Sequence, residues 1–438
     1  MNAETTLHPT PPRRPVVAVV VQHHAEETAM LRHVRSVLVR APHVRLLQLG
    51  RLDERIAAHL DGLAVAGDAG TALLVAALER PGAGEVFALG VRSIEQRDAP
   101  RLEHLLALGE VLPEAWRGLA SAFGWVPAPQ LQGHVAPLLA ASSPQRRELA
   151  LVACRLHRVD PGAALDAALA DPDEALRAQA LRCAGALGRV DLRHRVVAAI
   201  ADAAPAVACR AAWAACLLGE RGRALPRLTA LALDDGPQAA VALEMALLAA
   251  ERGAAQEIAQ SLSAAAQARP GERRALRRLI QALGLLGDPR FVPWLIERMD
   301  DPALARLAGE ALSWISGADL ARQDLETLTP PPLSESPSDD PEDDDVALDA
   351  DDSLPWPDPQ RLRRWWEREQ SQLGAAEPPL FLGRRRDVAS LRLALADGTQ
   401  RQRALAALAL CLLQPGQRLF PVAAPAWRQK RWLGVTGL

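Results

Sequence analysis

The chain has 438 residues and a formal net charge of −3, a length that suits two or three domains or one elongated array. Hydrophobic residues make up 49% of the chain, yet only 3% are aromatic and Tyr is absent. The apolar bulk is therefore Ala, Leu and Val, and because Ala and Leu are strong helix formers, this composition predicts an all-α protein. The five Cys residues are odd in number and show no Cys-x-x-Cys spacing. That pattern argues against a disulfide framework and against a zinc site, and we expect buried free thiols.

The N-terminal region is expected to begin with a disordered stretch, residues 1–15, followed by a cap of three helices in residues 16–80. The apolar run 16–21 is too short to span a bilayer or to form the core of a signal peptide. We therefore expect a cytoplasmic protein that does not associate with membranes. His23 and Glu27 are four residues apart, which is the spacing of neighbours on a helix surface, and they do not form a His-Glu-x-x-His motif. We interpret them as a solvated helix face and expect no metal site.

An internal repeat dominates the middle of the chain, residues 81–326. Counted from Leu304, apolar residues recur at positions +4, +7, +8 and +11, which form one stripe of an α-helix. The same pattern starts at Ala83, Ala115, Gln145, Leu176, Val207, Ala239, Glu272 and Leu304, at intervals of 30 to 33 residues. A Pro lies one to four residues ahead of each start, where its missing N–H costs nothing in the first helical turn.

Between successive stripes lies a shorter apolar segment, for example residues 191–200 and 289–299. Each unit of about 31–33 residues is therefore predicted to be a pair of antiparallel helices. One pair cannot bury both of its apolar faces, so the prediction for the array is an all-α fold, an α-solenoid of stacked helix pairs.

The segment LGDPRFVPWLIERMDDPALARLAGEALSWISG, which ends at Gly317, resembles a HEAT repeat of the short kind found in bilin lyases. The family's aliphatic–Arg pair is matched by Leu176-Arg177 and more loosely by Cys209-Arg210 and Ala305-Arg306, whereas the units that start at Ala239 and Glu272 lack it. Three further segments resemble an uncharacterised bacterial HEAT-repeat family. They are LDERIAAHLDGL, LPWPDPQRLRRWW and LADGTQRQRALAALAL. The resemblance implies a HEAT fold and a setting in type VI secretion gene neighbourhoods.

Beyond the array, residues 327–355 are rich in Pro, Ser and Asp, which predicts a disordered acidic linker. Residues 334–352 carry ten carboxylates and no basic residue, and without them the chain has 50 basic and 43 acidic residues, a net charge of +7. In residues 356–438 we expect a helix capped by Asp358, then a further HEAT-like hairpin whose stripe starts at Arg401. The sequence leaves open whether this hairpin stacks on the array.

The chain lacks the P-loop, Gly-x-Ser-x-Gly and His-Glu-x-x-His motifs, so we expect no catalytic site, no cofactor and no enzymatic activity. Asp288 and Asp301 are interpreted as helix-capping residues and not as an acid–base pair. The leading hypothesis is a scaffold or adaptor for a protein partner, accessory to a bacterial secretion system. In the usual HEAT arrangement the shorter helices line a concave binding surface. The candidate partner-binding residues there are Arg193, Arg195, Trp294 and Arg298.

Two alternatives remain. Clusters of Arg with neighbouring Trp could bind nucleic acid, because Arg contacts phosphates and Trp stacks on bases. The same clusters could instead dock an anionic ligand or the acidic linker. The candidate residues for the anionic ligand or the linker are Arg273, Arg274, Arg277, Arg278, Arg384, Arg385 and Arg386. The nucleic-acid alternative also includes Arg361, Arg363, Arg364 and Arg368, which surround Trp365 and Trp366. A bilin-lyase-like activity is the less favoured alternative, since nothing in the sequence indicates a tetrapyrrole site.

Overall fold

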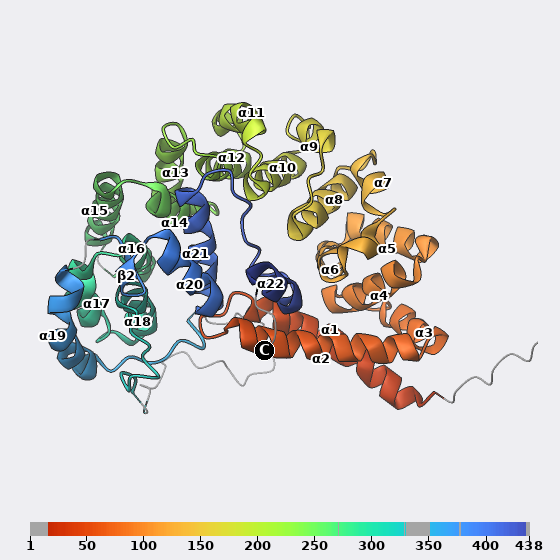
Figure 1. The fold of residues 1–438 in the computed structure, drawn as a ribbon, viewed down its shortest axis with the longest axis horizontal. Coiled ribbons are helices and arrows are strands. Elements are labelled where there is room, and N and C mark those ends of the chain that lie inside the picture. Colours follow the sequence, from red (N-terminus) through yellow and green to blue (C-terminus); the bar gives the residue numbers. More distant parts are fainter. Residues whose placement is uncertain (1–15, 270, 328, 330–350, 376–377, 435–438) are drawn as a thin grey trace, which may run out of the picture. The chain divides into compact units, whose positions relative to one another are not determined.

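The computed structural model describes residues 16–269, 271–327, 329, 351–375 and 378–434 (Figure 1). The described chain is all-α, as the composition predicts, with 22 α-helices and one two-stranded antiparallel sheet. The expected disorder of residues 1–15 and of most of the linker 327–355 lies outside the described residues. The chain divides into two compact units, Met1–Arg35 with Arg51–Leu131 and Ser36–Gly50 with Gln132–Leu438.

The first unit contains most of the three helices expected at the N-terminus and the first two stripes. Its elements are α1 (Ala18–Leu38), α2 (Leu46–Val65), α3 (Asp68–Ala77), α4 (Ala83–Gln96), α5 (Ala99–Val111), α6 (Pro113–Trp125) and the 3₁₀ helix η1 (Ala128–Leu131), with the end of α1 and the start of α2 belonging to the second unit. Helices α4 and α6 pack directly on each other. Arg35 on α1 holds the buried carboxylate of Asp53 on α2 at 2.5 Å and stacks on Trp125 at the end of α6. A charge pair and an aromatic contact therefore join the first two helices to α6.

The second unit contains the remaining repeats and the C-terminal region. Its helices up to the linker are α7 (Val135–Leu139), α8 (Pro144–His157), α9 (Ala163–Ala168), α10 (Glu174–Leu187), α11 (Arg193–Ala198), α12 (Pro205–Leu217), α13 (Ala224–Leu233), α14 (Ala239–Ala249), α15 (Arg252–Ala268), α16 (Arg273–Leu286), α17 (Val292–Arg298) and α18 (Pro302–Ser316), with 3₁₀ turns η2 (Val190–Leu192), η3 (Ala199–Ala201) and η4 (Pro289–Phe291). After the linker come α19 (Pro359–Ala375), β1 (Leu380–Phe381), β2 (Arg384–Arg385), α20 (Val388–Asp397), α21 (Gln400–Leu413) and α22 (Ala426–Leu433).

The helix boundaries follow the capping residues in the sequence. Asp301 accepts a hydrogen bond from the N–H of Ala303 at the start of α18, and Asp173 accepts one from Leu176 in α10. Asp288 caps the short η4 turn before α17, and Pro293 lies in the first turn of α17 without breaking it. The interpretation of Asp288 and Asp301 as helix-capping residues is confirmed.

The predicted stripes form the core. We call α8, α10, α12, α14, α16 and α18, which carry the pattern, the stripe helices, and α9, α11, α13, α15 and α17 the intervening helices. Successive stripe helices pack on one another. Ala308, Ala311, Leu312 and Ile315 are all buried, as are the matching residues after Leu176 and Val207. The helical-pair packing expected from the repeat is therefore present.

The stripe helices form the inner row of an arc in the second unit, and the intervening helices form its outer row (Figure 1). The expectation that residues 191–200 and 289–299 line the inner surface was therefore wrong. Small residues allow close packing between stripe helices. Gly185 on α10 faces Ala214 on α12, and Gly284 on α16 faces Ala311 on α18, so closely that an added Cβ at either Gly would lie within 3.0 Å of the Ala.

The C-terminal hairpin of α20 and α21 lies inside this arc and packs against α12 and α14 (Figure 1). The chain around it runs along the C-terminal ends of the stripe helices, whose last carbonyls lack partners within their own helix. Leu380 donates its N–H to the carbonyl of Gly287 at 2.8 Å, Gly416 to Leu217 at 3.0 Å, and Leu419 to Ala186 at 2.8 Å. The hairpin predicted from Arg401 therefore packs on the array, the alternative that the sequence left open.

A buried polar network fastens α21 to α22 and to residues 36–50. Arg403 is fully buried and donates to the carbonyl of Leu395, to Oε1 of Gln400 and to Oε1 of Gln429. Gln400 in turn donates its backbone N–H to Val44 at 2.7 Å. In this network the cation Arg403 donates only to neutral oxygen atoms. Together with the Gln400–Val44 bond it holds α21 to α22 and to residues 36–50.

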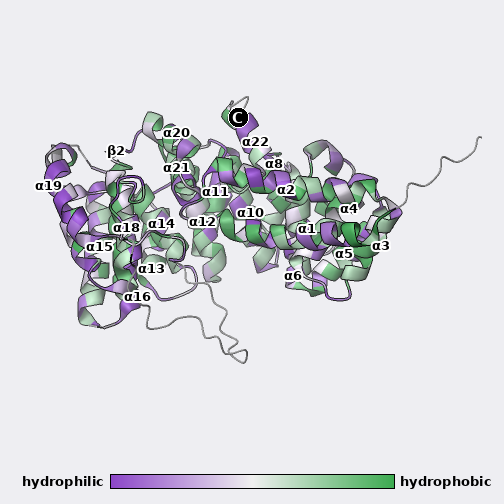
Figure 2. Cartoon of the chain, turned by 90° about the horizontal axis from the view of Figure 1, so that it is seen from below, coloured by the Kyte–Doolittle hydropathy of each residue, from purple (hydrophilic) through white to green (hydrophobic). Residues whose placement is uncertain are grey.

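Hydropathy varies between helices, and α19 is hydrophilic over much of its length (Figure 2). Among the described residues no single helix is both long and apolar enough to cross a membrane. Helices α2 and α3 reach the required length and composition only as a pair, across a bend of 116°.

Candidate functional site

The four candidate partner-binding residues lie on two helices of the outer row. Arg193 and Arg195 are exposed on α11, where Arg195 donates to the carbonyl of Asp166 at 3.2 Å. Trp294 and Arg298 lie one turn apart on α17, and the guanidinium of Arg298 stacks over the Trp294 ring at 5.1 Å. The structure brings Trp294 and Arg298 together and keeps Arg193 and Arg195 on a separate helix pair.

Trp294 borders a groove on the array, which we call the α15–α17 groove, with a volume of about 440 Å³. Leu279 and Leu283 of α16 line it between the two outer helices. Its other lining residues are Gln256, Ala259, Gln260 and Ser263 of α15, and Arg290, Phe291 and Trp294 of η4 and α17. The groove thus combines apolar and aromatic side chains with several hydrogen-bonding groups.

The α15 side of this groove was not predicted from the sequence. Gln256, Gln260 and Ser263 are spaced by four and three residues, so they share one face of their helix. The spacing indicates a polar helix face in the sequence. It identifies a groove only in the structure, where Trp294 lies on the other side of that groove. Arg290 at the end of the groove holds the buried carboxylate of Asp288 at 2.6 Å. Burial opposes ionisation of Asp288, but hydrogen bonds from the Arg290 side chain and backbone hold its pKa below the usual value.

Three of the four Arg residues in the α16 cluster have partners inside the protein. Arg277 forms two hydrogen bonds of 2.6 Å with the carboxylate of Asp351, which belongs to the acidic stretch 334–352. Arg278 pairs with Asp235 at 2.8 Å, and Arg274 donates to the carbonyl of the same residue at 3.0 Å. Arg273 is exposed. The sequence left two anionic partners open for this cluster, a separate ligand and the acidic linker. Arg277 is bound to an acidic residue of the linker.

The second Arg run is divided by its fold. Arg384 and Arg385 form strand β2 and are exposed. Arg386 is partly buried and donates to the carbonyl of Leu285 at 3.4 Å. Burial, together with the nearby charge of Arg221, lowers the pKa of Arg386 to about 10. Arg386 therefore contacts the C-terminal end of α16, whereas the α16 cluster lies in the N-terminal half of that helix.

Helix α19 begins after Asp358, as predicted, and packs against α17. Trp365 is only 7% exposed, so its ring faces the protein. Arg361 pairs with Asp324 at 2.6 Å, and Arg363 pairs with Asp300 at 2.8 Å. Arg361, Arg363 and Trp365 are therefore used in internal contacts, whereas Arg364 and Arg368 are exposed.

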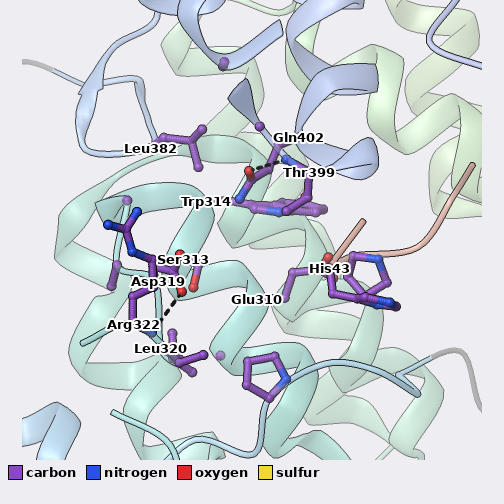
Figure 3. A pocket seen from close by; sticks show the side chains of 18 of the residues that line it. His43, Glu310, Ser313, Trp314, Asp319, Leu320, Arg322, Leu382, Thr399 and Gln402 are labelled. Atoms are coloured by element: carbon purple, nitrogen blue, oxygen red, sulfur yellow. Dashed lines mark hydrogen bonds between the residues drawn. The ribbon is translucent and has the colours of Figure 1, made fainter. Parts of the chain in front are cut away.

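A cavity with a volume of about 1020 Å³ lies between α18, residues 318–326, residues 42–45 and the start of α21 (Figure 3). Two of the carboxylates that line it form ion pairs, Glu310 with Arg401 at 2.8 Å and Asp319 with Arg45 at 3.3 Å. Burial raises the pKa of Glu310 despite the neighbouring Arg401.

Trp314 lies below Thr399 and Gln402 in this cavity, and His43 lies near Glu310 (Figure 3). Of the hydroxyl groups that line it, that of Ser390 is hydrogen-bonded to the carboxylate of Asp387, the N-cap residue of α20.

Two further groups bear on metal and thiol chemistry. His24 and His59 approach at 3.0 Å between their Nδ1 atoms, and burial together with His24 lowers the pKa of His59. Within the described parts of the chain, no group of three or more His, Cys, Asp or Glu residues is arranged to hold a metal ion. All five cysteines are free and buried, as predicted.

No protein-family model matches this chain, and no curated protein matches it.

Proposed function

We propose that this chain is a HEAT-like α-solenoid that serves as a protein-interaction scaffold without enzymatic activity. The repeat interval of 30 to 33 residues, the buried stripes and the packing of consecutive helix pairs support the solenoid. The setting as an accessory of a bacterial secretion system rests on the sequence resemblance alone.

The observation that carries the scaffold proposal is the α15–α17 groove. Its apolar floor and the Trp294 ring suit an apolar anchor side chain of a partner segment, while Gln256 and Gln260 can bond to that segment's polar groups. The inner row is a poorer candidate, because α20, α21 and the adjoining chain already contact it. Partner binding is therefore proposed for the outer row.

The internal contacts of the Arg clusters favour a protein partner over nucleic acid. Arg277 and Arg363 are paired with Asp residues, and Trp365 is buried. A nucleic acid would have to displace these carboxylates before it could contact the guanidinium groups.

The test is affinity capture from the native host with mass spectrometry, using the full chain and a Trp294→Ala, Arg298→Ala double variant. A buried Trp anchor typically contributes about 2 kcal/mol or more, so capture of the specific partner should fall by roughly thirtyfold. Arg193→Ala, Arg195→Ala tests the second candidate pair, and Arg392→Ala on an exposed position of α20 is the matched control. Circular dichroism must show that each variant is folded. Capture that is unchanged in the Trp294, Arg298 variant would overturn the groove assignment.

A further inference from the structure

Two histidines join the N-terminal half of α1 to the C-terminal half of α2. The Nδ1 atoms of His24 and His59 lie 3.0 Å apart, which is a hydrogen-bonding distance. A neutral imidazole ring has one N–H donor and one acceptor nitrogen, whereas a protonated ring has two donors and no acceptor. The bond therefore needs at least one of the two rings to be neutral.

The packing of α1 on α2 holds these rings in place. The ring of His24 lies against Gly62, three residues after His59, so closely that a Cβ added at Gly62 would lie 2.6 Å from two of the ring atoms. The ring centroids of His24 and His59 are 5.1 Å apart, and the His23 ring meets that of His59 at 5.8 Å in a T-shaped arrangement. Three imidazole rings and one glycine thus form one contact between the two helices.

The charges around the pair do not favour a second proton. The titratable and charged groups around His59 are His24, His23 and Glu27 of α1 and Arg55 of α2. The carboxylate of Glu27 lies 3.6 Å from the guanidinium of Arg55, so part of its charge is already balanced. Burial and the charge of His24 lower the pKa of His59 below its usual value of 6.5, and the charge of Glu27 offsets them only in part.

A second polar contact between the same helices does not respond to protonation of these rings. Arg35 holds the buried carboxylate of Asp53 at 2.5 Å, near the other end of the α1–α2 pair. An ion pair between a carboxylate and a guanidinium keeps both charges in the range in which His titrates, about pH 5 to pH 8. Acid therefore acts on the His24 end of the pair, while the Arg35 end stays bonded.

We propose that the His24–His59 pair is a pH-sensitive contact, and that protonation of both rings releases the N-terminal half of α1 from α2. The first proton is tolerated, because a protonated ring can still donate to a neutral one. The second proton leaves two cationic donors 3.0 Å apart, and like charges at this distance repel each other.

The direction of the pH dependence follows from His59. Its pKa is lower in the folded chain than in the unfolded chain, so the unfolded chain takes up this proton first as the pH falls. The contribution of the contact to the free energy of unfolding is therefore fully present above about pH 6.5 and is lost as the pH falls below that value.

The test is amide hydrogen exchange of the full chain at about pH 7.5 and about pH 5.5, corrected for the intrinsic dependence of exchange on pH. We expect the protection of residues 18–28 to fall by about fivefold or more at the lower pH, and that of the segment around Arg35 to change by less than about twofold. In a chain labelled at histidine, the imidazole resonances of His24 and His59 should titrate in two separate steps, the second below about pH 6.5. Unchanged protection of residues 18–28, or a single titration step shared with His104, would overturn the proposal.

Two variants separate the pair from other effects of acid. His24→Asn and His59→Asn each replace one titrating ring by a neutral amide, so each should remove most of the fall in protection. His104→Asn changes an exposed His on α5 of the same unit, and this matched control should respond to pH as the unmodified chain does. Each variant is compared with itself at the two pH values. A fall that persists in both ring variants, or one that disappears in the control, would contradict the assignment to this pair.

Discussion

Arg277 holds the carboxylate of Asp351 with two hydrogen bonds of 2.6 Å, although the two residues are separated by 74 positions in the chain. Nearby, Thr327 donates its N–H to the carbonyl of Trp356 at 2.8 Å, and Arg306 stacks on the Trp356 ring. Thr327 at the start of the linker and Trp356 just after its end are therefore bonded to each other on the array. The segment predicted to be a linker has both of its ends fixed on one surface.

Asp351→Asn should destabilise the chain. The Asp351 side chain is 6% exposed and Arg277 is 28% exposed, so the substitution leaves a partly buried guanidinium without its counter-charge. We expect a loss of about 1–3 kcal/mol in the free energy of unfolding, measured from urea midpoints. The control, Glu297→Gln, removes a carboxylate that is 61% exposed from its pair with Arg298 and should change stability by less than about 0.5 kcal/mol. Equal effects of the two substitutions would contradict the role of Asp351.

Gly287→Ala should loosen the contact between the array and β1. Gly287 has a φ of 66°, and an added Cβ would collide with the carbonyl of Leu380. Gly162 has a similar φ of 62° with open space around the same position, so Gly162→Ala measures backbone strain alone. Strain should cost about 1–2 kcal/mol in both variants, and the collision should add about 1 kcal/mol or more in Gly287→Ala.

Amide hydrogen exchange gives a local measurement of the same effect. Leu380 bonds to the carbonyl of Gly287, so its amide should exchange faster in the Gly287→Ala variant than in the Gly162→Ala variant. Identical exchange at Leu380 in the two variants would show that the collision is absorbed elsewhere.

Ionisation of Glu244 should lower the free energy of unfolding as the pH rises. Burial raises its pKa to about 7, so the folded chain binds a proton that the unfolded chain releases near pH 4.5. The contribution of Glu244 to the free energy of unfolding is fully present below about pH 4.5 and is lost between about pH 4.5 and about pH 7. Glu244→Gln should remove this dependence and gain about 1–3 kcal/mol at pH 8 relative to the unmodified chain. Urea midpoints at pH 5, 7 and 8 measure it, with the exposed Glu257→Gln as control.

Arg403→Met should be among the most destabilising substitutions in the C-terminal region. Removal of the guanidinium leaves the buried oxygens of Gln400 and Gln429 without the donors that they have now. We expect a cost of about 3–5 kcal/mol, against less than about 0.5 kcal/mol for Arg392→Met, which changes an exposed Arg on α20. Limited proteolysis should also release α22 more readily. A small effect of Arg403→Met would mean that water replaces the lost donors.

The sequence by itself determined the local structure of this protein. Stripe spacing, Pro in the first turn and capping Asp residues predicted helices such as α10, α18 and α19, because these signals act within one or two turns of helix. Burial of the stripe residues after Leu304 followed from the same pattern, since a helix pair must cover its apolar face. The cluster on α16 was also predicted, including a linker carboxylate as one possible partner.

Only the tertiary structure decided which surfaces remain open. Helices almost thirty residues apart meet at close contacts such as that of Gly185 with Ala214, and the packing of the helix pairs places α17, which carries Trp294, on the outer row. The hairpin of α20 and α21 occupies the inside through hydrogen bonds to helix ends, which carry no sequence signal because the backbone makes them.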